Sequence, residues 1–232
     1  MSNKLFGAGN EVPAVVVIRL PQYVRALAEL LRRDVPVVSS EQLGAQLQVT
    51  AAQIRKDLSY FGRFGKQGRG YPVRYLLEEL RQVLGLERRW NACLVGVGRL
   101  GRAIISYPGF TPEGFYIIAA FEENPRQVGQ KLGALVIQPV SELKETIKER
   151  DIHIGIVAVP ADQAQGVIDQ LVRCGIGAIL NYAPIGPQVP PGVRVRNIDP
   201  ILALQSMTYY LKLGGHGATA PSGDYKESQG ES

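Results

Sequence analysis

The 232-residue sequence predicts an α/β protein in two parts, a helical N-terminal domain followed by a parallel-sheet domain. Three observations support this. Apolar residues recur at helical spacing before residue 85, and short apolar strands alternate with helices after residue 91. The glycines Gly96, Gly98 and Gly101 directly follow the apolar run Ala92–Val95. A chain of this length is long enough to bury two hydrophobic cores.

The first helix is expected over residues 12–33, after an N-terminal stretch, 1–11, that we expect to be disordered. Its apolar positions follow a helical period: Val16, Leu20, Tyr23, Leu27, Leu30 and Leu31. Pro21 disfavours one continuous helix, so we expect it in a first turn, with residues 12–20 as a separate lead-in.

Two short helices follow, separated by a tight turn at Gln48-Val49. Ser39 and Ser40 are expected to cap the first, Glu41–Leu47, and Thr50 to cap the second, Ala51–Tyr60. Thr50 and Gln53 have the spacing of a capping box. In the second helix an inward face carries Ile54, Leu58 and Phe61, whereas Gln53, Arg55, Lys56 and Ser59 face other directions, as a recognition helix requires.

A basic, glycine-rich segment, residues 62–72, comes next and is expected to form a tight hairpin. Residues 1–90 carry 14 lysine and arginine residues against 8 acidic ones, and residues 50–74 carry six against one. A solvated surface usually mixes both signs, so this excess indicates a phosphate-binding face. A helix-turn-helix pattern alone is weak evidence, but with the basic hairpin it predicts a winged helix. The candidate DNA-contacting residues are Ser40, Thr50, Gln53, Arg55, Lys56, Ser59, Tyr60, Arg63, Lys66 and Arg69.

Another amphipathic helix is expected at Tyr75–Leu84 and a linker at Gly85–Trp90. The expected strands are Ala92–Val95, Tyr116–Phe121, Ile152–Val159, Ala178–Asn181 and Val193–Arg196. The expected helices are Leu100–Ser106, Val140–Glu149, Ala161–Cys174 and Pro200–Leu213, the last with Asp199 as its cap. The domain boundaries are thus 12–85 for the winged helix, 86–198 for the Rossmann-type domain, 199–213 for the last helix and 214–232 for a disordered tail.

The glycine triad has the strand before it and the helix after it that dinucleotide binding needs. Gly96 permits the turn, Gly98 lets the backbone approach a diphosphate, and Gly101 allows the helix to pack closely on the strand. Glu122, at the end of the next apolar run, is placed to accept hydrogen bonds from the adenosine ribose. The alternative is a Rossmann-type fold that binds no dinucleotide.

The remaining composition restricts the classes of function. No run approaches the roughly 18 uncharged apolar residues of a membrane span, and the N-terminus lacks a signal-peptide core, so we expect a cytoplasmic protein. Cys93 and Cys174 lie in or beside apolar segments and are expected to be inert buried thiols rather than thiol sensors or a disulfide. His153 and His216 have no zinc-site spacing with them, so no metal is expected.

The string Arg55-Lys-Asp-Leu-Ser-Tyr-Phe-Gly62, the glycine segment and Gly96-Val-Gly-Arg-Leu-Gly101 resemble Rex, the family of bacterial redox-sensing transcriptional repressors. The resemblance extends over residues 12–213 and includes Tyr107-Pro-Gly-Phe110, Val159-Pro160 and Asn197-Ile-Asp199. It implies a homodimer that binds an inverted-repeat operator, is released when NADH replaces NAD⁺, and exchanges its C-terminal helix between subunits.

The same resemblance implies roles near the nicotinamide for Tyr107, Val159, Pro160 and Asp199, and places Arg25 near the junction of the two domains. The implied dinucleotide-contacting set also contains Gly96, Val97, Gly98, Arg99, Leu100, Gly101 and Glu122. One departure stands out, because family members usually carry Phe-Asp-x-Asp where this chain has Phe121-Glu122-Glu123-Asn124. Glutamate still accepts ribose hydrogen bonds and repels a 2′-phosphate, so NAD(H) remains the expected ligand.

Two other classes of function share the Rossmann pattern. An NAD-dependent oxidoreductase needs an acid–base group beside the nicotinamide, and neither histidine is well placed for that role. A CoA-ligase-type nucleotide-binding subunit leaves the basic N-terminal domain unexplained. We therefore expect a non-enzymatic repressor that binds double-stranded DNA and uses NADH and NAD⁺ as regulatory ligands.

Overall fold

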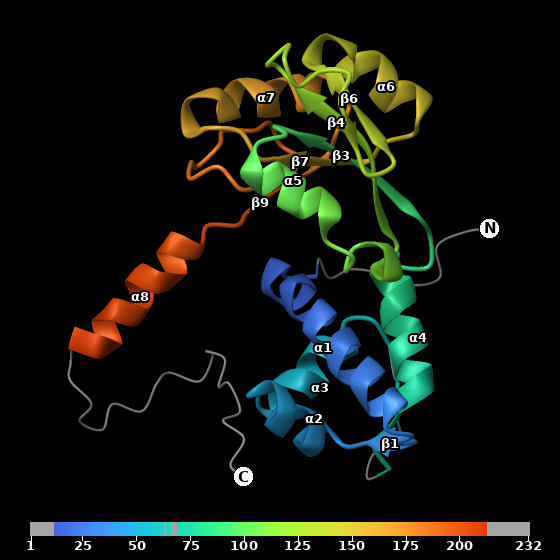
Figure 1. Cartoon of the computed structure of the whole chain (residues 1–232). Helices are drawn as coiled ribbons and strands as arrows, with labels where there is room; N and C mark the ends of the chain where they lie inside the picture. The colour runs from blue at the N-terminus through green and yellow to red at the C-terminus, as the bar shows by residue number, and fades with distance from the viewer. Residues whose placement is uncertain (1–11, 63, 66–68, 213–232) are drawn as a thin grey trace, which may run out of the picture. The chain divides into compact units, whose positions relative to one another are not determined.

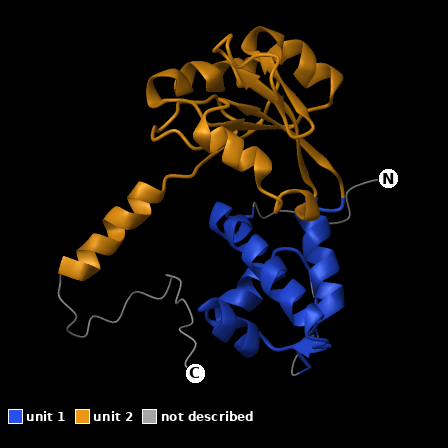
Figure 2. Cartoon of the chain, in the orientation of Figure 1, with its two compact units in different colours: residues 1–87, 217–232 blue, residues 88–216 orange. Residues whose placement is uncertain are grey.

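The computed structural model describes residues 12–62, 64–65 and 69–212, and the chain divides after Glu87 into two compact units (Figure 2). The first unit has one hydrophobic core, and the second has two, one on each face of its sheet. Within the described ranges, none of the helices combines the length and the hydropathy that crossing a membrane would require.

The first unit is helical, with one small strand pair (Figure 1). Its elements are α1 (Ala14–Arg32), β1 (Val37–Val38), α2 (Ser40–Leu47), α3 (Ala51–Ser59), β2 (Tyr71–Pro72) and α4 (Val73–Val83). Their apolar faces meet in a core in which Tyr23, Leu27, Leu43, Ile54 and Leu80 are fully buried. As the sequence predicted, the inward face of α3 carries Ile54 and Leu58.

The expected break in the first helix was wrong, because α1 is continuous and contains Pro21 in its interior. Proline removes one backbone donor from a helix, which disfavours the helix but does not prevent it. Here Pro21 is exposed, whereas Leu20 and Tyr23, close to it in the sequence, are buried in the core of the unit. Tertiary packing therefore outweighs the local preference.

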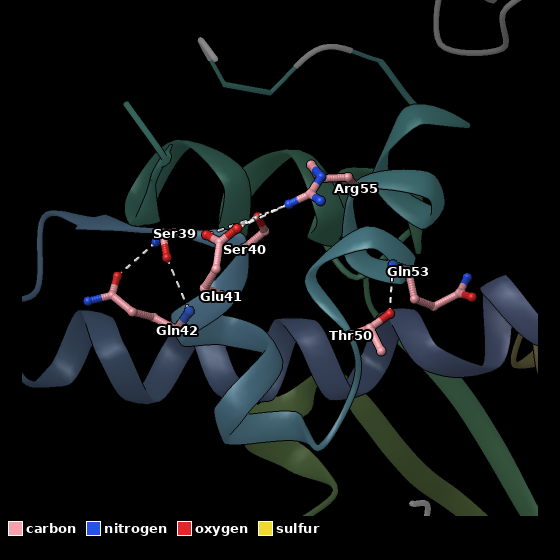
Figure 3. Close-up of polar contacts among 7 residues, drawn as sticks. All are labelled: Ser39, Ser40, Glu41, Gln42, Thr50, Gln53 and Arg55. Atoms are coloured by element: carbon pink, nitrogen blue, oxygen red, sulfur yellow. Dashed lines mark hydrogen bonds and ion pairs between the residues drawn. The ribbon is translucent and has the colours of Figure 1, made fainter. Parts of the chain in front are cut away.

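The helix caps agree with the sequence except in two details, the first being that Ser40, expected to share the cap of α2, is the first residue of that helix. Ser39 accepts a hydrogen bond from Gln42 N at 3.1 Å, and Gln42 Oε1 accepts one from Ser39 N at 2.9 Å, which completes a capping box (Figure 3). Thr50 accepts from Gln53 N, but the Gln53 side chain bonds to Asp57 instead of returning to Thr50. The expected capping box at Thr50 is therefore only half formed.

The glycine-rich segment differs from the expected hairpin. Strand β2 pairs antiparallel with β1, which lies some thirty residues earlier, in the register Val38 to Tyr71. Gly70 has φ +71°, and a Cβ there would lie 2.7 Å from the carbonyl oxygen of Val38, so only glycine fits. Residues 63 and 66–68, which include the predicted DNA contacts Arg63 and Lys66, lie outside the described residues.

The second unit is a parallel sheet flanked by helices. Its elements are β3 (Trp90–Val95), α5 (Arg99–Ser106), η1 (Thr111–Glu113), β4 (Phe115–Glu122), β5 (Lys131–Leu132), β6 (Leu135–Pro139), η2 (Val140–Glu142), α6 (Leu143–Glu149), β7 (Ile154–Val157), α7 (Ala161–Arg173), β8 (Ala178–Asn181), β9 (Arg194–Asn197) and α8 (Pro200–Lys212). Strand order is β5-β6-β4-β3-β7-β8-β9, and only the β5–β6 pair is antiparallel.

Alternate residues of β3 face opposite sides of this sheet. Cys93 and Val95 pack with residues of α6 and α7, whereas Ala92 and Leu94 pack with Ile104 of α5. Helices α6 and α7 thus cover one face of the sheet and α5 the other (Figure 1). The chain runs outward from β3 to β4 and β6, then returns to β7 on the other side of β3. The strand order therefore reverses between β3 and β7, where open α/β sheets bind ligands.

Several expected boundaries in and around this unit are corrected. Trp90, expected in the linker, begins β3, and α4 starts at Val73 rather than Tyr75. The β5–β6 hairpin was missed, and the expected helix 140–149 opens as the single turn η2. The expected strand 152–159 is shorter, since β7 ends at Val157. Leu213 and the expected tail 214–232 lie outside the described residues.

Candidate functional site

The turn between β3 and α5 gives each of its three glycines a separate role. Gly96 has φ +98°, and a Cβ there would lie 2.5 Å from the carbonyl oxygen of Ala158. A Cβ at Gly101 would lie 2.0 Å from the carbonyl oxygen of Gly96, so glycine is needed for the helix to pack on its own turn. A Cβ at Gly98 would meet nothing within 4 Å. Protein atoms therefore pack closely around Gly96 and Gly101, whereas the space beside Gly98 is free.

The same turn exposes the start of a helix. Gly98 is the N-cap of α5 and supplies no side-chain cap, and the first backbone bond of the helix runs from Arg102 N to Gly98 O at 3.0 Å. Arg99 and Leu100 in the first turn are exposed. Unpaired N–H groups at the positive end of a helix are a site for a phosphate or another anion.

The end of β7 lies against this glycine turn. Val159 Cγ1 would lie 2.7 Å from a Cβ at Gly96, so the Val159–Pro160 turn touches the glycine turn directly. Pro160 is the N-cap of α7, which begins at Ala161. The structure thus brings together Gly96 and Val159, which lie more than sixty residues apart in the sequence. A separate pocket lies between α7 and the segment 185–190, and its lining includes Ala161, Gln165, Asp169, Ile185, Gly186 and Gln188 but no residue of the glycine turn.

Glu122, at the end of β4, is tied to the glycine turn. Its Oε2 accepts a hydrogen bond from Val97 N at 2.7 Å, and its Oε1 accepts from Glu123 N at 2.9 Å and from Asn124 N at 3.1 Å. The carboxylate is therefore part of the turn's own structure, a role that the sequence did not reveal. A carboxylate has about four acceptor sites, so capacity for a further donor remains.

Tyr107 and Asp199, the two residues that were expected near the nicotinamide, lie on separate segments. Tyr107 follows α5, is 59% exposed, and packs edge-on against Phe110 with ring centroids 5.3 Å apart. Gly109 permits this, because a Cβ there would lie 2.3 Å from the Tyr107 ring. Asp199 Oδ1 accepts from Ile201 N at 3.0 Å, which is the helix cap predicted from the sequence. Within the described part of one chain the side chains of Tyr107 and Asp199 share no hydrogen bond. Arg25, which the resemblance placed near the junction of the domains, is an exposed residue of α1.

In the first unit, α3, the expected recognition helix, is anchored by a buried carboxylate that sequence reasoning missed. Asp57 is fully buried and accepts four hydrogen bonds, two from Arg19 at 2.6 and 2.7 Å, one from Tyr23 at 2.6 Å and one from Gln53 at 2.7 Å. Burial alone would raise the pKa of Asp57, but the donors from Arg19, Tyr23 and Gln53 hold it below its ordinary value. One sign of this role is present in the sequence, since Asp57 is the single acid among the cations of residues 50–74.

The predicted DNA-contacting residues occupy different environments. Lys56 and Ser59 are exposed on α3, and Ser59 Oγ donates to Lys56 O at 2.7 Å. Arg55 is exposed but paired, since its Nη1 donates to Ser40 Oγ at 2.8 Å and to Glu41 Oε1 at 3.2 Å (Figure 3). Tyr60 is half-buried against the core of the unit, Thr50 is an exposed helix cap, and Arg69 is exposed.

Comparison with family models separates the same two regions. Residues 11–59 match a model described as "Putative DNA-binding protein N-terminus", and residues 87–185 match one described as "CoA binding domain". Each match covers a different unit of the structure.

Relatives and solved structures match most of the chain. A redox-sensing transcriptional repressor Rex from Chloroflexus aurantiacus is 55% identical over 86% of this chain and 94% of its own length. Its namesake from Syntrophobacter fumaroxidans is 47% identical over 88% and 98%. A crystal structure of RSP in complex with β-NAD⁺ and operator DNA has a TM-score of 0.83 and 40% identity, covering 90% of this chain and all of the other. The complex of RSP with β-NADH has a TM-score of 0.79 and 38% identity, covering 88% and 96%.

Proposed function

The chain belongs to the Rex family of redox-sensing transcriptional repressors, and on that premise we propose how its two units divide sensing and repression. It is a DNA-binding repressor with NADH and NAD⁺ as its regulatory ligands. The first unit binds an inverted-repeat operator as part of a homodimer, and NADH bound to the second unit releases it. We place the protein in the cytoplasm and assign it no catalytic activity.

One observation carries this proposal. The glycine turn lies at the point where the strand order reverses, in the same chain as a helical unit with an anchored recognition helix. The residues fit a dinucleotide, because Gly98 leaves open space, the first turn of α5 offers backbone donors and Glu122 retains acceptor capacity. We assign diphosphate contact to Gly96, Val97, Gly98, Arg99, Leu100 and Gly101, and ribose contact to Glu122.

Discrimination between the two redox forms belongs to a different set of residues. The nicotinamide ring is positively charged in NAD⁺ and neutral in NADH, while the rest of the molecule is the same. The glycine turn and Glu122 therefore bind both forms alike and shift no equilibrium by themselves. We assign the discrimination to Tyr107, Asp199 and the Val159–Pro160 turn. Tyr107 supplies an exposed aromatic face, and the Oδ2 oxygen of Asp199 accepts no hydrogen bond within the described chain.

Homodimer formation is assigned to α8. Large apolar side chains on this helix are exposed in a single chain, among them Ile201, Leu202, Leu204, Met207, Tyr209 and Leu211. A helix that is apolar on all sides is stable in water only when other surfaces cover it. We propose that a second copy covers it and that the helix is exchanged between subunits. Two-fold symmetry then gives two recognition helices for the two half-sites of an operator.

The oxidoreductase alternative has little support from the site. His153, the residue before β7, lies at the N-terminal end of the strand, whereas the glycine turn lies at the carboxyl ends. It packs edge-on against Trp90 and faces Asp151 at 3.4 Å. A catalytic acid–base group must reach the reacting ring. The CoA alternative again leaves the first unit without a role.

The decisive experiment measures operator binding with each nucleotide. An operator duplex is selected from random sequences with the full chain and NAD⁺, and binding is followed by fluorescence anisotropy. We expect tight binding with NAD⁺ and release with NADH. Linkage requires the operator to weaken NADH binding by the factor with which NADH weakens operator binding. Equal NADH affinities with and without the duplex would refute the proposal.

A further inference from the structure

A carboxylate at the start of α2 is paired with an arginine of the recognition helix. Nη1 of Arg55 donates to Ser40 Oγ at 2.8 Å and to Glu41 Oε1 at 3.2 Å, and the Ser40 hydroxyl lies 3.3 Å from both carboxylate oxygens of Glu41 (Figure 3). The guanidinium, hydroxyl and carboxylate thus form a closed cluster between α2 and α3.

Stability of the fold does not account for this cluster. The side chains of Arg55 and Glu41 are 54% and 70% exposed, and ion pairs at such exposure contribute little to folding. The two helices are already held by their caps at Ser39 and Thr50 and by buried apolar side chains. A role in DNA recognition is the remaining explanation.

Glu41 is a negative charge on a surface that must approach DNA. Hydrogen bonds from its own backbone N–H and from Ser39 lower the pKa of Glu41 against the opposing effect of desolvation, with smaller contributions from Ser40 and the charge of Arg55. The carboxylate is therefore ionised at neutral pH. A phosphate that approached Arg55 would lie beside this carboxylate and be repelled. The edge of a base is neutral and meets no such repulsion.

We propose that Glu41, acting with Ser40, is a positioning residue that makes Arg55 read a guanine base instead of binding a phosphate. Both of these bonds use Nη1, and Nε and Nη2 donate to no other residue in the described part of the chain. Two parallel donors on one edge of a guanidinium match the O6 and N7 acceptors of guanine. The next residue, Lys56, has no acidic partner in the described chain and is left for phosphate contact. This inference rests on the proposed operator binding.

The test compares two quantities for the full-length protein with NAD⁺, on the selected operator and on duplexes with single base-pair changes. The first is discrimination, the ratio of affinities for the operator and for each changed duplex. The second is the slope of log affinity against log salt, which reports phosphates neutralised at about −0.9 each. The variants are Glu41→Gln, Arg55→Ala and their combination, with Lys56→Ala as the phosphate-contact reference. Glu78→Gln, which removes an exposed carboxylate from α4, is the matched charge control.

Arg55→Ala should lower discrimination at one G·C pair roughly 5- to 150-fold while leaving the salt slope unchanged. Lys56→Ala should flatten the slope by about one unit at unaltered discrimination. Glu41→Gln should lower discrimination at the same G·C pair and steepen the slope by about 0.9, with no further loss of discrimination when added to Arg55→Ala.

Two results would overturn the inference: a slope flattened by Arg55→Ala as much as by Lys56→Ala, or Glu41→Gln behaving like Glu78→Gln. A wild-type protein that selects no duplex would instead refute the proposed function, so the two failures are distinguishable.

Discussion

Arg19 on α1 and Asp57 on the recognition helix form a forked ion pair, with Nε to Oδ2 at 2.6 Å and Nη2 to Oδ1 at 2.7 Å. Tyr23 and Gln53 donate to the same carboxylate, so its four acceptor positions are all used. An arginine fork fixes direction as well as distance. This buried carboxylate therefore helps to fix the orientation of α3 relative to α1, together with the apolar core that the two helices share.

This ion pair predicts an acid-sensitive first unit. Because the folded-state pKa of Asp57 is lowered, its stabilisation is complete above the unfolded value of about 3.9 and is lost as pH falls through the folded value. Hydrogen-exchange protection factors in residues 14–32 and 51–59, corrected for the intrinsic exchange rate at each pH, should therefore fall below about pH 4. Asp57→Asn should destabilise the unit by about 3–5 kcal/mol at pH 7 and remove that acid component. Asp34→Asn, at an exposed acid, is the control, and equal acid sensitivity in Asp57→Asn would contradict the assignment.

Substitutions at Gly98 and Gly101 of the glycine turn are expected to affect different properties, nucleotide binding at Gly98 and stability at Gly101. Gly98→Val should fold like the wild type, since nothing lies within 4 Å of its Cβ, yet bind NADH at least 100-fold more weakly because the diphosphate is blocked. Gly101→Ala should lower stability by about 1–3 kcal/mol, since its Cβ meets the Gly96 carbonyl oxygen. Thermal melting and nucleotide titration separate the two effects. Gly166→Ala on α7, where a Cβ has free space, is the folding control.

We expect the response to NADH not to depend on oxidation of Cys93 or Cys174. Burial raises the pKa of Cys93 to about 12 and also raises that of Cys174, so neither is a thiolate at neutral pH. Iodoacetamide at pH 8 should leave Cys93 unmodified in the native protein and label it only after unfolding. Cys174→Ser should bind the operator and respond to NADH unchanged in the presence of diamide. Native labelling of Cys93, read by mass spectrometry, would contradict this.

The exposed helix α8 predicts that the dimer depends on it. A chain ending at Asp199 should be monomeric in sedimentation velocity and should lose operator affinity, because one recognition helix contacts only one half-site. Its second unit should still bind NADH through the glycine turn, although contacts from Asp199 are weakened. A truncated chain that stays dimeric would show that another surface joins the subunits.

Local signals predicted much of the first unit. The cap at Ser39 and the inward face of Ile54 and Leu58 depend on residues within one or two helical turns, and each is found in the structure. The predicted break at Pro21 was wrong, because the packing that keeps α1 continuous involves side chains from other helices. The pairing of β2 with β1 likewise joins segments that are distant in sequence, which periodicity cannot detect.

The candidate site shows the same limit. The roles of Gly96 and Gly101 followed from the motif and its place between strand and helix, and their close contacts agree. Glu122 was predicted as a ribose ligand, but its bonds to the turn could not be predicted, since they depend on how β4 ends beside β3. The burial of Asp57 also escaped detection, because its partner Arg19 is 38 residues away in the sequence.

The bonds from Glu122 to Val97, Glu123 and Asn124 have a consequence for the response time of the sensor. They join groups of the protein itself, so we expect the nucleotide-binding turn to bind its ligand without first becoming ordered. Without an ordering step, association proceeds as fast as productive encounters occur. The delay between a change in cellular NADH and a change in occupancy is then governed by how quickly the previous nucleotide leaves.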